Sequence, residues 1–224
     1  MIKTAPNSKL GEGIYSIPDI AFLLRLPKGK VRRWLNDFWD NRLAEKFNQK
    51  YSWGEGREKA TNFYTLIEFY VFYQLRESGV GVKPIFSAHQ EMANQLKTNY
   101  PFASAELLTD GKSILYSLKD DTTVKADKTH QITFKEIIKD FCKKIEFSES
   151  RLAERYYPLG KQQHIIVDPN HQFGQPTNED TNLLAETIYR MHKAGESNDF
   201  LARLYDIPFN NVEAAISLFH NNAA

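Results

Sequence analysis

A proline inside an apolar and basic segment is the feature that most constrains the front of the chain. Ser16 is followed three residues later by Asp19, which is the spacing of a capping box, and the apolar residues behind them predict a short amphipathic helix ending near Leu24. Pro27 cannot extend that helix, but its fixed backbone angle suits the first turn of the next one. The sequence therefore predicts two short helices joined by a tight turn over residues 25–27.

The second helix, from Lys28 to Leu35, separates an apolar face from a basic face. At about 100° per residue, its apolar residues fall on one arc; these are Val31, Trp34 and Leu35. The opposite half carries four cations, which are Lys28, Lys30, Arg32 and Arg33. This pattern is typical of a helix-turn-helix, in which the first helix braces a second helix that presents polar side chains to a DNA groove. A solvated basic helix face is the alternative interpretation.

A glycine-containing turn follows the basic helix in the stretch KYSWGEGREKATNFY. Tyr51 and Trp53 alternate as in a strand, and two glycines behind them allow a turn. Arg57 and Lys59 follow those glycines. We interpret the stretch as a small β-hairpin wing that adds two cations to the basic surface.

Two further helices are predicted behind this hairpin. Thr65 and Glu68 have capping-box spacing and open a helix that is apolar all round, which indicates burial. Another apolar stripe starts at Val82 and predicts a long helix ending near Tyr100. Because a capped helix, a basic helix, a hairpin and a buried helix come in the order of a winged helix, we assign residues 1–100 to a winged helix-turn-helix domain.

The middle of the chain, residues 101–160, changes its hydrophobic period. Asp110 and Gly111 stand between two β-prone runs, which is a strong hairpin signal. An amphipathic helix around Cys142 and the strand-like run KKIEF complete a predicted small α+β connector. Cys142 is the only cysteine, which excludes an internal disulfide and a zinc site of several thiolates, and its neighbours indicate a core residue.

The rear, residues 161–224, begins with a short strand in HIIVDPNHQFGQPT and continues with three predicted helices. Gly195 closes the first helix, Ser197 caps the second, and an apolar stripe over residues 212–219 marks the third. These signals predict a trihelical, helix-turn-helix-like domain. The whole chain is therefore predicted to be mainly α-helical with small β elements.

The charge is unevenly distributed, although the whole chain carries only +1. Residues 1–100 hold 15 Lys and Arg against 10 Asp and Glu, residues 101–160 hold 10 of each, and residues 161–224 hold 4 against 8, giving +5, 0 and −4. Affinity for the DNA backbone comes from cations that neutralise phosphates, so the front is the candidate DNA-binding surface. The acidic rear would be repelled by phosphate and is assigned to protein contacts. Its last helix is expected to expose Asn210, Asn211 and Glu213.

Patterns for catalysis, metal binding and membrane insertion are missing from the sequence. His164, His171 and His192 lack the spacing of a metal site, and residues 54–58 contain glycines without a phosphate-binding lysine motif. We therefore expect no catalytic residue, no metal and no cofactor. The first residues resemble no signal peptide, and eighteen consecutive apolar residues occur nowhere. A cytoplasmic protein without a membrane span is expected.

The stretch YSIPDIAFLLRLPKGKVRRWL and, after the hairpin, YTLIEFYVFYQLRESGVGVKPIFSAHQEM resemble the N-terminal winged helix of MerR-type regulators, including LRESGV at residues 75–80. The rear, from IIVDPNHQFGQPTNEDT to VEAAISLF, resembles the domain-of-unknown-function 433 family. Asp180 stands where that family has glycine before Thr181. Asp tolerates a positive backbone angle better than most residues, so the loop is expected to form. Together with the connector, the arrangement is similar to VapB-type antitoxins of type II toxin–antitoxin pairs.

This resemblance implies a dimeric protein that binds double-stranded operator DNA through its front and a PIN-like ribonuclease toxin through its rear, repressing its own operon. The DNA contacts are then expected from Lys28, Lys30, Arg32, Arg33, Arg57 and Lys59. Two alternatives stay open at this point. One is a MerR-like transcription regulator that senses a ligand in its middle domain, and the other is a protein–protein adaptor whose two trihelical units bind no nucleic acid.

Overall fold

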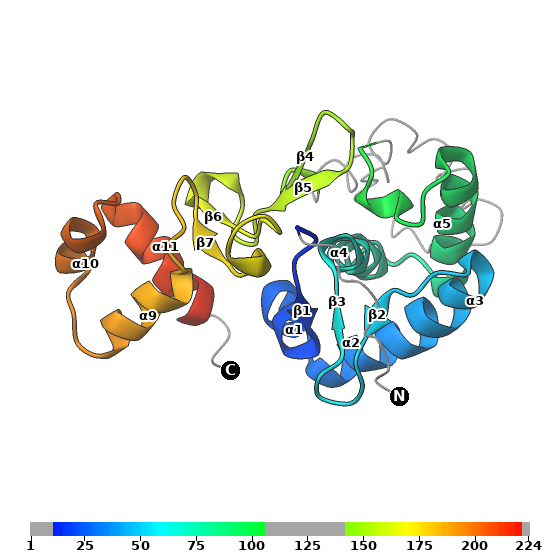
Figure 1. The fold of residues 1–224 in the computed structure, drawn as a ribbon, viewed down its shortest axis with the longest axis horizontal. Coiled ribbons are helices and arrows are strands. Elements are labelled where there is room, and N and C mark those ends of the chain that lie inside the picture. Colours follow the sequence, from blue (N-terminus) through cyan, green and yellow to red (C-terminus); the bar gives the residue numbers. More distant parts are fainter. Residues whose placement is uncertain (1–10, 106–141, 221–224) are drawn as a thin grey trace, which may run out of the picture. The chain divides into compact units, whose positions relative to one another are not determined.

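The structure, a computed structural model, describes residues 11–105 and 142–220 (Figure 1). Within these residues the fold is mainly helical and the strands form small antiparallel sheets, as predicted, while the winged helix-turn-helix arrangement of the front stays a prediction. The chain divides into two compact units, of which the first contains residues 1–63 and 155–224 and the second contains residues 64–154. The three consecutive domains expected from the sequence stay a prediction.

Strand β1 (Tyr15–Ser16) leads directly into α1 (Ile17–Leu24), and the predicted capping box is present at their junction. The backbone N–H of Asp19 donates to Ser16 Oγ at 3.3 Å, and the backbone N–H of Ser16 donates to Asp19 Oδ2 at 2.9 Å. Two backbone donors that a helix start leaves unpaired are thereby satisfied. The helix therefore begins where the sequence predicts.

The helix after the tight turn is longer than the sequence predicts. Arg25 ends α1 in a left-handed conformation, with a φ of 54°, and α2 (Lys28–Trp34) starts three residues later, as expected. The chain then continues through the π-helical segment η1 (Leu35–Leu43) into α3 (Ala44–Phe47), so the expected end near residue 35 is wrong. A buried apolar residue recurs every four positions, which keeps one face of the wider π-helical turns in the core. These residues are Val31, Leu35, Trp39 and Leu43.

The predicted hairpin forms from β2 (Ser52–Trp53) and β3 (Ala60–Thr61). Strand β1 pairs with the other edge of β3, which gives the antiparallel order β1-β3-β2. Gly54 has a φ of 72°, and a Cβ at this position would lie 2.4 Å from the backbone oxygen of Glu58. The turn therefore requires glycine here.

The second unit contains two long helices, α4 (Phe63–Glu77) and α5 (Val82–Leu96). Because α4 already begins at Phe63, the expected capping box at Glu68 is wrong. Glu68 is instead buried inside the unit, where its Oε2 lies 2.7 Å from Nε2 of His89. Its Oε1 accepts the backbone N–H of Phe102 at 2.8 Å. This carboxylate ties α4 to α5 and to the turn that follows them.

The connector is described only in part. The expected hairpin at residues 110–111 and most of the helix before Cys142 lie outside the described residues. The described part contains the 3-10 turn η2 (Pro101–Ala103) and the paired strands β4 (Ile145–Phe147) and β5 (Ala153–Tyr156), so KKIEF does end in a strand. Cys142 is buried, and this burial raises the pKa of its thiol to about 12, which agrees with a core residue.

The rear contains a two-stranded sheet of β6 (Ile165–Ile166) and β7 (Thr177–Asn178), followed by three helices. The helices are α9 (Ala185–Lys193), α10 (Asn198–Tyr205) and α11 (Phe209–His220), so three helices follow a short strand as predicted. Two 3-10 turns flank the sheet strands, η3 (Lys161–Gln163) and η4 (Gln172–Gly174).

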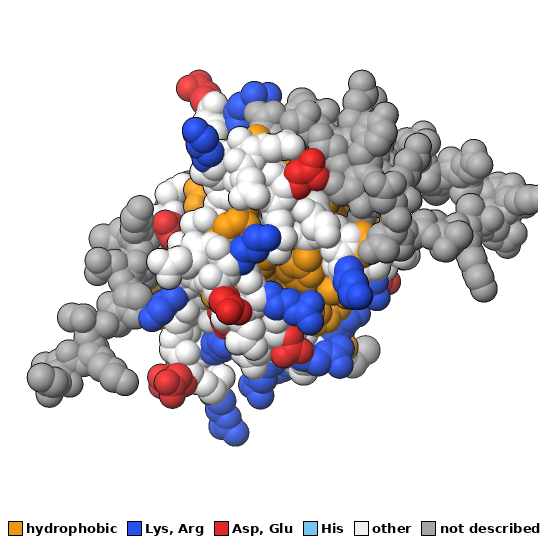
Figure 2. All heavy atoms as spheres, turned by 90° about the vertical axis from the view of Figure 1, so that its right-hand side faces the viewer, with side chains coloured by type: hydrophobic (Ala, Val, Ile, Leu, Met, Phe, Trp, Pro, Cys, Tyr) orange, Lys and Arg blue, Asp and Glu red, His pale blue; other side chains and the backbone are white. Residues whose placement is uncertain are grey.

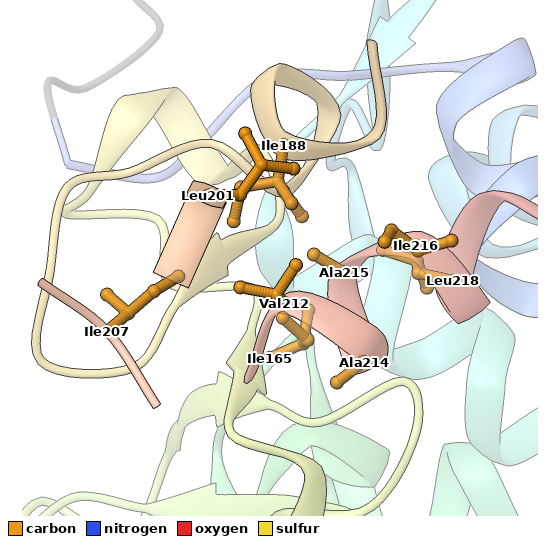
Figure 3. Packing of buried hydrophobic residues seen from close by; sticks show 10 residues of the cluster. Ile165, Ile188, Leu201, Ile207, Val212, Ala214, Ala215, Ile216 and Leu218 are labelled. Carbon is orange, nitrogen blue, oxygen red and sulfur yellow. The ribbon is translucent and has the colours of Figure 1, made fainter. Parts of the chain in front are cut away.

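Buried apolar side chains hold the three rear helices together (Figure 3). Ile165 contributes from β6, Leu201 from α10 and Val212 from α11, and their side chains converge in the centre of the rear helices. At about 25 cal/mol per Å² of buried apolar surface, such a cluster is the main stabilising contribution to this part of the fold. The remaining members are Ala185, Ile188, Ile207, Ala214, Ala215, Ile216 and Leu218.

The front and rear segments of the first unit contact each other directly. The ring of Phe22 in α1 lies 4.8 Å from the ring of Phe219 in α11, measured between centroids, and Tyr189 of α9 stacks on Phe219 at 5.0 Å. Ahead of β1, the backbone N–H of Ile14 donates to the carbonyl of Phe173 at 3.0 Å. Helix α1 is therefore supported both by α2 and by the last helix of the rear.

Candidate nucleic-acid interface

Helix α2 presents three of its four cations to solvent while its apolar residues enter the core. Lys28, Arg32 and Arg33 are exposed, whereas Trp34 is buried. Lys30 is half-buried because its ammonium group lies 4.7 Å from the centre of the Trp34 ring, a cation–π contact. The structure thus brings together the four cations expected on this helix.

Three of these cations are not neutralised by the protein's own carboxylates. Among residues 11–105 and 142–220, no ion pair involves Lys28, Arg32 or Arg33. A basic face that is fully compensated by intramolecular ion pairs could not attract phosphates. The charge on α2 is therefore available to a ligand.

Further cations lie on the same continuous helix beyond the point where the sequence placed its end. Arg42 and Lys46 are exposed, although Asp37 and Glu45 are exposed as well. The guanidinium of Arg42 lies 5.5 Å from the centre of the Phe38 ring. In the sequence, the apolar residues that recur every four positions from 31 to 43 were the signal that could have located this extension.

The hairpin provides less positive charge than its two cations suggest. Arg57 is exposed in the turn, but Glu55 and Glu58 are exposed beside it. Lys59 is mostly buried, with 18% of its side chain exposed, and its Nζ lies 2.5 Å from Asp40 Oδ2 in an ion pair. Of the two hairpin cations, Arg57 is therefore accessible to a ligand, whereas Lys59 is already in an ion pair.

Positive side chains are conspicuous on one side of the molecule. Figure 2 shows one face of the molecule, on which several Lys and Arg side chains lie with Asp and Glu side chains between them. Uncovered apolar surface lies between them.

The rear helices present the opposite charge and an apolar surface that the sequence did not predict. Glu213 and Asn210 are exposed on α11 as expected, but Asn211 is only 7% exposed, so its expected exposure is wrong. Asn211 precedes buried Val212 and points inward with the core face of the helix. Three large apolar residues are exposed here, namely Phe200 at 40%, Leu204 at 50% and Phe209 at 43%.

Two histidines of the rear, His164 and His171, contact carboxylates. Nδ1 of His164 lies 2.7 Å from Glu179 Oε2, and Nδ1 of His171 lies 2.9 Å from Asp168 Oδ2. In the part of the chain that the structure describes, no group of three or more potential ligands could hold a metal ion. Asp180 adopts a φ of 63°, the left-handed conformation anticipated for its loop.

No described helix has the length and apolar character needed to cross a bilayer. No protein-family model matches the chain. Among solved structures, the crystal structure of Rv2018 from Mycobacterium tuberculosis is similar to this chain, with a TM-score of 0.71 and 18% sequence identity. The matched region covers 90% of this chain and 96% of the Rv2018 chain. At this level of identity the likeness establishes a shared fold.

Among curated proteins, the chain is 23% identical over 166 residues to a protein named putative antitoxin VapB45 from Mycobacterium tuberculosis. The alignment covers 69% of this chain and 69% of that protein. This distant relative supports a VapB-type antitoxin and a role in a toxin–antitoxin system.

Proposed function

We propose that the protein is the antitoxin of a type II toxin–antitoxin system, which represses its own operon and neutralises a PIN-like ribonuclease toxin. The front binds double-stranded operator DNA, and the rear binds the toxin. The observation that carries this proposal is the exposure on α2 of Lys28, Arg32 and Arg33 without ion pairs among the described residues, together with the acidic rear and the curated relative named as an antitoxin. The protein acts by binding, without catalysis, metal or cofactor.

Helix α2 is the element that enters the DNA groove in this proposal. Its N-terminal turn carries Lys28 and Lys30, and Arg32 and Arg33 follow on the exposed face. Arg and Lys at these positions can neutralise phosphates, and Arg can also form paired hydrogen bonds to a guanine edge. α1 holds α2 in place through the tight turn after Arg25.

The hairpin adds a smaller contribution. Arg57 is accessible for one phosphate contact, while Lys59 must first exchange Asp40 for a phosphate. We therefore expect Lys59 to contribute least of the six proposed DNA contacts. Each phosphate contact lowers the slope of log K against log salt by about 0.9, so single substitutions can rank these residues.

A two-fold symmetric assembly is part of the proposal. A dimer that carries one α2 helix per subunit would read inverted half-sites separated by about one helical turn of DNA or a multiple of it. Neutralisation of the toxin is then assigned to the rear, because phosphate would be repelled by its exposed carboxylates.

The decisive experiment measures binding to the DNA directly upstream of the gene for this chain. Arg32→Ala combined with Arg33→Ala should weaken binding by about 100-fold. The slope of log K against log salt should become shallower by about 1.8, which corresponds to two lost phosphate contacts. The charge-matched control is Arg190→Ala combined with Lys193→Ala on α9, where both cations are exposed, and it should bind like the wild type. Equal affinity of the α2 variant and the wild type would refute DNA binding by this helix.

DNA binding and copurification together separate the two alternatives. A protein–protein adaptor should show no salt-dependent binding to duplex DNA, since it makes no phosphate contacts. A ligand-sensing regulator should bind DNA but should not form a complex with the PIN-like product of the adjacent reading frame. Copurification of the two proteins therefore distinguishes the antitoxin from a regulator.

A further inference from the structure

We propose that the exposed apolar residues of α10 and α11 form the docking surface for the toxin, which must present an apolar recess bordered by Lys and Arg. We call these residues the rear apolar surface, and they are Phe200, Leu204 and Phe209. The inference rests on the proposed function, because it names the surface and the partner chemistry of the rear domain.

The exposure of these side chains is not required by the fold. Leu201 of α10 and Ile207 after it already enter the core, being 0% and 7% exposed. Phe200 and Leu204 are four positions apart and therefore lie on one face of α10. A helix that satisfies the core with one face and carries two large apolar residues on another is typical of a protein-binding surface.

Helix α10 holds this surface in a fixed conformation. Ser197 Oγ accepts the backbone N–H of Phe200 at 3.2 Å and caps the start of the helix. At the other end, Asp206 is left-handed with a φ of 52°, and the backbone N–H of Ile207 donates to the carbonyl of Ala202 at 3.0 Å. Binding therefore does not have to order this segment, which favours affinity.

The surrounding charge decides what kind of partner fits. Between residues 196 and 220 there is one Arg against four acidic residues, a net charge of −3, and all five side chains belong to exposed residues. The cation is Arg203, and the acidic residues are Glu196, Asp199, Asp206 and Glu213. A second copy docked face to face would bring like charges together, and phosphate would be repelled as well. The occupant is therefore a protein with a basic rim.

The test uses the full-length chain and the purified PIN-like protein encoded by the adjacent reading frame. Phe200→Ala combined with Leu204→Ala should weaken their complex by about 100-fold, since central apolar contacts dominate interfaces. The matched control is Phe173→Ala, which removes an aromatic ring that is 70% exposed elsewhere in the rear; its complex should keep the wild-type affinity. Circular dichroism and operator binding should stay unchanged in both variants.

A second variant tests the charged rim without touching the apolar residues. Glu196→Lys combined with Glu213→Lys should weaken the complex by about tenfold, with the larger loss at low salt. A rise in affinity, or no change, would overturn the assignment of a basic partner.

The outcomes separate the inference from the proposed function. If the wild-type chain does not bind the adjacent protein, the proposed function fails and the docking surface loses its partner. If the wild type binds and the Phe200/Leu204 variant binds equally well, the inference alone is overturned. Light scattering adds a third outcome, because a variant that turns a wild-type dimer into a monomer would show that a second copy occupies this surface.

Discussion

The front helix pair α1–α2 and the rear helix pair α10–α11 share the same local geometry but differ in charge. In each, a serine caps an eight-residue helix, a left-handed residue ends it, and a proline precedes the second helix. The left-handed residues are Arg25 at a φ of 54° and Asp206 at 52°. Counting from the capping serine, Arg32 of the front corresponds to Glu213 of the rear.

This pairing shows that one local backbone arrangement can carry exposed side chains of different charge and polarity. Both second helices bury a valine at the same position, Val31 and Val212, so the core demands are alike. The exposed positions differ, because Lys28 of the front corresponds to Phe209 of the rear. Under the proposed function, the choice between DNA and protein would be encoded in a few exposed side chains.

The largest effect is expected when the front is given the residues of the rear. Arg32→Glu combined with Arg33→Ala places in α2 the side chains found at Glu213 and Ala214. The loss of two cations and the gain of a carboxylate should weaken operator binding by about 1000-fold. Fluorescence anisotropy with the upstream DNA measures this loss. Glu213→Arg serves as the control, and an equally large change from it would show that the rear also contacts DNA.

A smaller effect is expected in the hairpin behind the front helix pair. Gly54→Ala forces a Cβ against the backbone oxygen of Glu58 and keeps an unfavourable positive φ. The free energy of unfolding should fall by about 2–3 kcal/mol, measured by urea denaturation. Gly56→Ala, where a Cβ would meet nothing within 4 Å, should lose only about 1 kcal/mol. Equal losses would show that the positive φ, and not the close approach, determines the requirement for glycine.

The two capping serines allow a direct comparison of the helix pairs. Ser16 takes part in a reciprocal capping box that is partly buried, whereas Ser197 makes the single exposed bond to Phe200. Ser16→Ala should cost about 1–2 kcal/mol of folding free energy, and Ser197→Ala should cost about 0.5–1 kcal/mol. Thermal melts of both variants measure the difference, and Ser16→Thr should keep most of the stability. A reversed order would contradict the capping geometry.

The sequence predicted the capped helices, the tight turn and the hairpin because local signals determine them. Ser16 with Asp19, and Pro27 behind them, act within a few residues and need no tertiary partner. The extension of α2 was missed because it depends on the packing of Trp39 and Leu43 in the core. Glu68 was mistaken for a cap for the same reason, since its partners His89 and Phe102 are distant in sequence.

The sequence predicted which charged residues lie at the candidate interface, but it did not predict which of them are accessible to a ligand. Charge counting located the cations of α2 and the acidic rear correctly. It could not show that Asp40 pairs with Lys59, because the two residues are nineteen positions apart. The rear apolar surface was missed because Leu204 fits the apolar stripe of α10, and only the fold shows that it lies outside the core.

The smallest effect concerns the contact between the two helix pairs. The Phe22 and Phe219 rings join α1 to α11 at 4.8 Å, so a double-mutant cycle with alanine at both positions should give a coupling energy of about 0.5–1.5 kcal/mol. Urea denaturation of the four proteins provides the values. The control cycle combines Phe22 with the exposed Phe209 and should give no coupling.

The Phe22–Phe219 contact also joins the two proposed binding surfaces, so it can be tested as the connection between them. A toxin bound to α10 and α11 can alter α1, and through it α2, only by changing contacts that differ between the bound and free states. If the Phe22–Phe219 pair transmits that change, the double alanine variant should bind operator DNA with the same affinity whether or not the toxin is present. A toxin effect that persists in this variant would place the connection elsewhere, for example at the hydrogen bond between Ile14 and Phe173.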